Sequence, residues 1–213
     1  MLITFEGIDG CGKTTQAALL AEQLRNDGIE VLHLREPGGT ELSEQVRTLL
    51  LNKDYTHPLA SEAELLLFAA SRAQLIHEVI KPALARDAVV ILDRFTDSTI
   101  AYQGFGRGIP LGFIEHVNRL ATADIEPDLT FLLDIPLAVA SDRRASSGKD
   151  RIENETESFY NHVIQGYMYV AQHHTERVNV IDGTDSVENI RHNIWRLVQE
   201  ERNYDITHAH HVN

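Results

Sequence analysis

The feature that most constrains this chain lies near its N-terminus, where residues 7–14 read Gly-Ile-Asp-Gly-Cys-Gly-Lys-Thr. This run matches G-x-x-x-x-G-K-[ST], the phosphate-binding loop. Residues 2–5 before it form an apolar run typical of a buried strand, and residues 15–24 after it have apolar residues at helical spacing. A strand and a helix around the loop are the context that the motif requires, so we predict a phosphate site here.

The chemistry of such a loop follows from its residue types. Glycines let the backbone curl around an anion, and backbone N–H groups at the helix N-terminus then point at phosphate oxygens. Lys13 adds positive charge for the β- and γ-phosphates, and the Thr14 hydroxyl is placed to hold Mg²⁺. The residues expected around the phosphates are Gly7, Ile8, Asp9, Gly10, Cys11, Gly12, Lys13, Thr14 and Thr15. The alternatives are an ordinary glycine turn and, for Cys11, either a reactive thiol or a small residue that fits a tight loop.

Composition limits the class of protein. A length of 213 residues suits one α/β domain, and we see no repeat or linker that would divide residues 1–213. The net charge of −13 argues against a surface that coats nucleic acid. We expect no membrane segment and no signal peptide, and the single cysteine fits a reducing, cytoplasmic location.

Helical and strand patterns alternate along the rest of the chain, which predicts an α/β fold with a central parallel sheet flanked by helices in three layers. Further strands are expected at residues 30–34, 88–92, 129–133 and 178–181. Further helices are expected at residues 41–51, 61–85, 157–172 and 187–201, whereas residues 138–147 begin as a helix and become a small, basic, flexible patch. Ser61 is the expected N-cap of its helix, with Glu64 completing a capping box.

Asp93 and Arg94 follow the most apolar strand. A carboxylate at the C-terminal end of a buried strand, in a chain with a phosphate loop, is a candidate Mg²⁺ ligand of the Walker-B kind. Arg94 would face the same crevice and could bind phosphate through two N–H groups. The alternative for Arg94 is a structural salt bridge.

Two segments could recognise a nucleobase. Phe68 and Arg72 share one helix face and could clamp a flat base, or they could be a core phenylalanine and a surface arginine. Residues 96–108 include Thr99, Tyr102 and Gln103, whose polar and aromatic groups suit a base edge and a sugar. That segment could equally be a solvated helix and loop.

A basic island interrupts the acidic chain at residues 140–152. It contains Arg143, Arg144, Lys149 and Arg151, with Ser146, Ser147 and Gly148 as a possible hinge. We predict a lid that closes over phosphates, the alternative being a solvated run of charge. The tail from His208 to Asn213 could chelate metal, but we expect it to be a disordered end.

Together these motifs resemble the bacterial thymidylate kinase family. The likeness extends over nearly the whole chain, and its most specific element is Arg35-Glu36-Pro37-Gly38-Gly39-Thr40. The other matching segments are Phe5-Glu6-Gly7, the Phe68/Arg72 helix, Asp93-Arg94-Phe95, Ala101-Tyr102-Gln103-Gly104 and the lid. The resemblance implies the P-loop NTPase fold, a homodimer, and phosphorylation of dTMP to dTDP with ATP and Mg²⁺ in dTTP biosynthesis.

The resemblance also implies roles for single residues. Asp9 would face the dTMP sugar or the metal-bound phosphate, and Arg35 and Arg94 would surround the acceptor phosphate and the transferring group. Phe68 would stack on thymine, and Arg72 would bond its O4.

Thr99 and Gln103 would contact the base, and Tyr102 would lie beneath the deoxyribose. Lys13 and one lid arginine would neutralise the moving phosphoryl group, and Thr14 and Asp93 would hold the metal. The lid arginine is Arg143, Arg144 or Arg151, and the sequence does not choose between them.

Two other activities remain open from the sequence. A deoxynucleoside kinase shares the loop and the acid–arginine pair, but it needs a general base because its acceptor hydroxyl is neutral. A nucleotide-dependent switch shares the loop as well, although this chain lacks a correctly spaced guanine-specificity motif.

Overall fold

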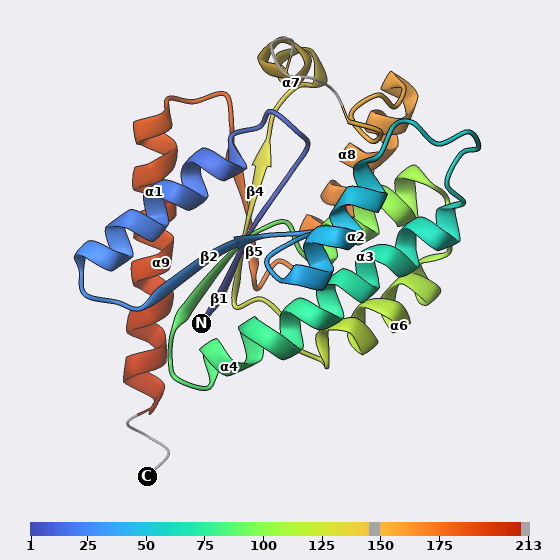
Figure 1. The fold of residues 1–213 in the computed structure, drawn as a ribbon. Coiled ribbons are helices and arrows are strands. Elements are labelled where there is room, and N and C mark those ends of the chain that lie inside the picture. The colour runs from blue at the N-terminus through green and yellow to red at the C-terminus, as the bar shows by residue number, and fades with distance from the viewer. Residues whose placement is uncertain (145–149, 210–213) are drawn as a thin grey trace.

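Five parallel strands form the centre of the computed structural model, which describes residues 1–144 and 150–209 (Figure 1). In spatial order they are β2 (Val31–Arg35), β3 (Val89–Asp93), β1 (Leu2–Glu6), β4 (Leu129–Asp134) and β5 (Val178–Asp182). Every neighbouring pair is parallel, so the predicted α/β fold with a central parallel sheet is confirmed.

Helices cover both faces of the sheet (Figure 1). On one face α1 (Lys13–Asn26) packs beside α9 (Val187–Ala209). The other face carries α2 (Glu41–Leu51), α3 (Ser61–Leu75), α4 (Lys81–Leu84), α6 (Leu111–Thr122) and α8 (Glu157–His173). The short α5 (Thr96–Thr99), the π-helices η1 (Ile76–Ile80) and η2 (Ile100–Gly106), and α7 (Leu137–Arg144) complete the set.

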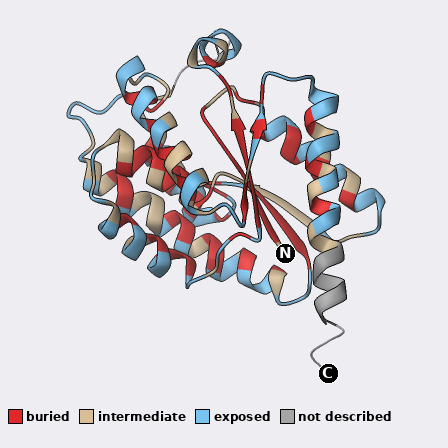
Figure 2. Ribbon diagram, turned by 180° about the vertical axis from the view of Figure 1, so that it is seen from behind, coloured by how far each residue is buried: buried red, intermediate tan, exposed pale blue. Residues whose placement is uncertain are grey.

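The apolar strand residues explain this layering. Side chains alternate between the two faces of a strand, so Ile3 and Phe5 of β1 pack with Leu24 of α1 while Leu2 packs with Ile80 of η1 on the other side. Figure 2 shows the strands largely buried between the helical layers. A sheet covered on both faces accounts for the continuous apolar runs in the sequence.

The structure corrects several details of the predicted elements. Ala60, not Ser61, is the N-cap of α3 and makes no side-chain hydrogen bond there, and Glu64 is buried in an ion cluster instead of closing a capping box. Helix α6 was not predicted, although Ile114, Asn118 and Ala121 form a buried helical stripe. Helix α9 extends to Ala209, beyond the predicted end at residue 201; residues 210–213 lie outside the described part.

The carboxyl ends of β1, β2 and β3 meet at one edge of the sheet. Phe5 and Arg35 both pair in register with Asp93, so the phosphate loop, the Arg35 segment and Asp93–Arg94 are brought together. This edge is where α/β proteins bind ligands. Within the described ranges, no helix has the length and apolar character needed to cross a bilayer.

Candidate active site

The phosphate loop connects the end of β1 to the start of α1. Gly7, Gly10 and Gly12 have φ values of 131°, 87° and 104°, which L side chains rarely adopt. A Cβ on Gly7 would lie 2.6 Å from the carbonyl oxygen of Leu133. The strand, loop and helix predicted from the motif are therefore confirmed.

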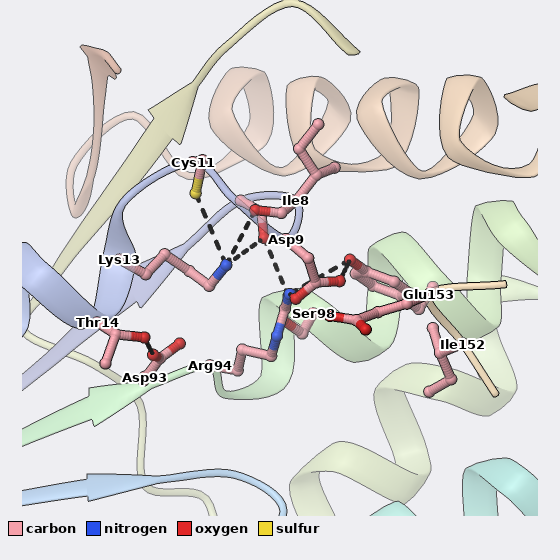
Figure 3. A network of polar contacts seen from close by, with 12 residues as sticks. Ile8, Asp9, Cys11, Lys13, Thr14, Asp93, Arg94, Ser98, Ile152 and Glu153 are labelled. Carbon is pink, nitrogen blue, oxygen red and sulfur yellow. Dashed lines mark hydrogen bonds and ion pairs between the residues drawn. The ribbon is translucent and has the colours of Figure 1, made fainter. Parts of the chain in front are cut away.

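Lys13 is folded back over this loop. Its side chain is buried, and Nζ donates to the carbonyl oxygens of Gly7 and Ile8, both at 3.0 Å, beside Cys11 Sγ at 3.6 Å (Figure 3). The ammonium group therefore lies against the backbone of the loop. Cys11 is itself buried, which favours its interpretation as a small residue fitted to the turn over that of an exposed reactive thiol.

Thr14 and Asp93, the two residues expected to hold a metal ion, lie side by side. The Thr14 hydroxyl donates to Asp93 Oδ2 at 2.5 Å (Figure 3). Mg²⁺ prefers oxygen ligands and commonly takes one or two from the protein, with phosphate oxygens and water completing the shell. These two side chains fit that requirement, whereas the described residues include no cluster of three His, Cys, Asp or Glu side chains that could hold a metal.

Arg94 pairs with Asp9 at the mouth of the loop. Its guanidinium lies 2.6 Å from Asp9 Oδ1 and donates to Ser98 Oγ at 3.1 Å (Figure 3). It also donates to the Tyr167 hydroxyl at 2.9 Å. Burial lowers the pKa of Arg94, but the combined electrostatic effect of Asp9, Tyr102, Tyr167 and Asp93 outweighs it and holds that pKa well above its usual value. The salt bridge considered as an alternative exists, and the guanidinium still faces the cavities described next.

Two adjacent cavities open at this edge of the sheet. The larger, about 710 Å³, follows the phosphate loop and is lined by Lys13, Thr14 and Asp93, among others. The smaller, about 100 Å³, is lined by the predicted base-recognition residues Phe68, Arg72, Thr99, Tyr102 and Gln103. The residues that line both cavities are Asp9, Glu36, Arg47 and Arg94. The Asp9–Arg94 pair therefore stands at the boundary between them.

Arg72 is a buried residue, so the surface-arginine alternative is wrong. Its guanidinium donates to Glu36 Oε2 at 2.8 Å, Thr99 Oγ1 at 3.0 Å, Asn118 Oδ1 at 2.9 Å and the Phe95 carbonyl at 3.1 Å. The solvated-loop alternative for residues 96–108 is also wrong, because Thr99, Tyr102 and Gln103 are buried. The Arg94 guanidinium carbon lies over the Tyr102 ring, 5.1 Å from the ring centroid.

The basic residues predicted around the phosphates lie in different places. Arg35 lines the larger cavity and donates to Glu44 at 3.0 Å. Arg143 also lines the larger cavity, donating to the Gly183 carbonyl at 3.3 Å. Arg151 lines neither of the two cavities and pairs with buried Glu64 at 2.6 Å. The Arg144 side chain and residues Ser146, Ser147, Gly148 and Lys149 lie outside the described part of the structure.

Sequence reasoning missed several residues of the site. Arg47 of α2 lines both cavities, and Glu153 lines the larger one with its side chain directed toward Asp9 (Figure 3). No motif marks either residue, because their positions depend on how α2 and residues 150–156 pack against the sheet.

Glu6 was also missed as a site residue, and it lies directly behind Arg94. Its carboxylate accepts from Ser98 Oγ at 2.6 Å and from the Tyr167 hydroxyl at 3.2 Å, the two hydroxyl groups that contact Arg94. Burial, reinforced by the charge on Asp97, raises the pKa of Glu6 to about 7.

This pKa predicts a pH-dependent contribution to stability. Glu6 takes up its proton at higher pH in the native state than in the unfolded chain, so its contribution is complete below about pH 4.5 and is lost as the pH rises through about 7. Between about pH 5 and about pH 8, the wild type should lose on the order of 3 kcal/mol of unfolding free energy relative to Glu6→Gln. Urea unfolding at both pH values measures this difference. Glu30→Gln, at an exposed ion pair, is the control, and parallel profiles for wild type and Glu6→Gln would contradict the assignment.

Comparison with known proteins adds a family match. A family model described as thymidylate kinase matches residues 5–194. The thymidylate kinase of Kosmotoga olearia is 46% identical over 91% of this chain and 93% of its own length. That of Prosthecochloris aestuarii is 45% identical over 95% of this chain and 94% of its own length.

A solved structure agrees with these sequence matches. The crystal structure of thymidylate kinase from Ehrlichia chaffeensis aligns with a TM-score of 0.76 at 40% sequence identity. The alignment covers 93% of this chain and 98% of that chain.

Proposed function

This chain belongs to the thymidylate kinase family, and we propose that it transfers the γ-phosphoryl group of ATP to dTMP at the boundary between its two cavities. The observation that carries the proposal is the shared wall formed by Asp9 and Arg94. A donor in one cavity and an acceptor in the other would bring their phosphates together at this pair.

The two substrates are assigned by the chemistry of each cavity. The triphosphate of ATP lies along residues 7–15, where the glycine-rich backbone and Lys13 favour anions. The thymine of dTMP lies in the smaller cavity against Phe68, with Arg72 and Gln103 at its polar edge. Tyr102 then supports the sugar, and the 5′-phosphate points toward Arg94.

Catalysis in this arrangement is mainly alignment and neutralisation of charge. The attacking oxygen of dTMP is already anionic, so no general base is needed. Lys13, Arg94 and Arg143 would face the transferring group from different sides, and fixed positive charges stabilise a phosphoryl transition state. Holding the two phosphates in line supplies much of the remaining rate enhancement.

Mg²⁺ is the metal that this site suits best. The Thr14 hydroxyl and the Asp93 carboxylate would hold it, and it would neutralise negative charge on the ATP phosphates. The remaining ligands would be phosphate oxygens and water, as is usual for this ion in nucleotide sites.

A panel of acceptors tests the reaction directly. ADP release is measured with ATP and Mg²⁺ in the presence of dTMP, dUMP, dCMP, dGMP, dAMP, thymidine or no acceptor. We expect strong turnover with dTMP, with dUMP far behind. Turnover with thymidine but not dTMP would indicate a deoxynucleoside kinase, and hydrolysis stimulated by a partner protein without acceptor would indicate a switch.

The structure favours Arg143 over Arg151 as the lid arginine, because Arg143 lines the larger cavity and Arg151 lines neither of the two. Arg143→Ala should lower kcat by about 10²–10³-fold through the loss of one transition-state charge. Arg151→Ala should instead affect stability more than kcat, because it leaves the buried Glu64 carboxylate without one of its cationic partners. Steady-state kinetics and thermal unfolding of both variants measure this contrast. The opposite pattern would assign the catalytic role to Arg151.

We also propose a homodimer through the outer face of α3 and α6. Leu66 on α3 and Phe113 and Leu120 on α6 are large apolar side chains that are 59%, 68% and 85% exposed. Such exposed apolar groups on two packed helices favour a protein partner, here a second copy of this chain. A solution mass of one chain at micromolar concentration would contradict the dimer.

The single, unpaired cysteine supports a reducing cytoplasmic location.

A further inference from the structure

Glu64 lies behind the smaller cavity as the centre of a buried ion cluster. Its side chain is 1% exposed, and Arg107 donates to both of its oxygens at 3.1 Å. Arg151 approaches Oε2 at 2.6 Å. Burial opposes the charge of this carboxylate, but the hydrogen bonds and charges of the arginines outweigh it and lower its pKa. Glu64 is therefore ionised and can only accept hydrogen bonds.

This carboxylate fixes the orientation of the Gln103 amide. Gln103 lies 2.7 Å from Glu64 Oε1, and only its NH₂ group can donate to a carboxylate. Nε2 therefore faces Glu64, and Oε1 is turned away from it. Gln103 lines the smaller cavity, and no described residue donates a hydrogen bond to its Oε1. The amide thus offers the cavity an acceptor.

Arg72 supplies a complementary donor in the same cavity. A guanidinium group has five N–H donors, and the structure uses four of them, on Glu36, Thr99, Asn118 and the Phe95 carbonyl. One N–H on the terminal nitrogen that bonds Phe95 remains for a ligand. The cavity therefore presents one donor and one acceptor to the edge of a base.

We propose that Glu64 is a positioning residue that sets base selectivity by holding the Gln103 amide with its oxygen toward the base. A pyrimidine with a carbonyl at C4 and a hydrogen on N3 matches this edge, as thymine and uracil do. Cytosine has an amino group at C4 and an acceptor at N3, so both of its groups oppose the pattern. This inference rests on the proposed placement of dTMP in the smaller cavity.

The orientation of the Gln103 amide is stable because the flipped orientation would lose its hydrogen bond to Glu64. Turning Gln103 over would place its oxygen against the Glu64 carboxylate, so two acceptors would face each other in a buried site. The Glu64→Gln substitution removes that penalty, since the amide that it introduces can either donate or accept. Gln103 could then turn to donate to N3 of cytosine.

The test compares kcat/KM for dTMP, dUMP and dCMP in wild type and Glu64→Gln. The ratio of dTMP to dCMP should fall by about 5- to 10-fold, as expected for one hydrogen bond that no longer discriminates. The ratio of dTMP to dUMP should stay unchanged, because the two bases share the same polar edge. A loss of kcat/KM that is equal for all three acceptors would mean a purely structural role and would overturn the proposal.

Two further variants make the result specific. Glu155→Gln is the matched control, because Glu155 also accepts from Arg107 but has no hydrogen bond to Gln103, so both ratios should stay at the wild-type values. Gln103→Ala should lower the ratio of dTMP to dCMP by itself, and adding Glu64→Gln should change it no further. An unchanged ratio in Gln103→Ala would overturn the proposal even if Glu64→Gln fails to fold.

The same experiment separates this inference from the proposed function. Wild-type turnover with dTMP tests the function, whereas the ratios between acceptors test Glu64. If the wild type fails to use dTMP, calorimetric binding of the same monophosphates still measures the selectivity. Equal affinity of the wild type for dTMP and dCMP would then overturn the role of Glu64.

Discussion

The pair formed by Arg94 and Asp9 is the interaction on which the site depends. Arg94 follows β3 with a φ of 74°, a conformation that costs a non-glycine residue on the order of 1–3 kcal/mol. That backbone turns its guanidinium toward Asp9 in the phosphate loop, 2.6 Å away. Because the pair lies between the two cavities, it relates the position of one ligand to that of the other. The strain is offset by hydrogen bonds that Arg94 donates to Ser98 and Tyr167.

Behind this pair the structure buries carboxyl groups where an apolar core would be simpler. Glu6 supports the hydroxyl groups around Arg94, Glu36 supports Arg72, and Glu64 supports Gln103. A buried ion pair often adds little to stability, so these groups are better explained by the precision that they give to the residues facing the cavities. Each carboxylate fixes a donor or an acceptor whose direction a ligand can recognise.

The sequence predicts the fold and the phosphate loop because both depend on local patterns. Continuous apolar runs mark the buried strands, and the spacing of Gly7, Gly12, Lys13 and Thr14 marks the loop. Prediction from the sequence fails where the partners of a side chain lie far away along the chain. Glu64 fits a capping box by spacing, yet its partners come from η2, from Arg107 and from residue 151. Arg47 could not be placed for the same reason, since its position depends on how α2 packs against the sheet.

The central claim is that donor and acceptor occupy the two cavities at the same time and exchange the phosphoryl group directly. Initial rates measured over a matrix of ATP and dTMP concentrations test it most directly. Direct transfer requires both substrates to be bound together, so double-reciprocal plots should give lines that intersect. Parallel lines would indicate that ADP leaves before dTMP binds, through a phosphorylated enzyme. That result would contradict transfer across the Asp9–Arg94 boundary.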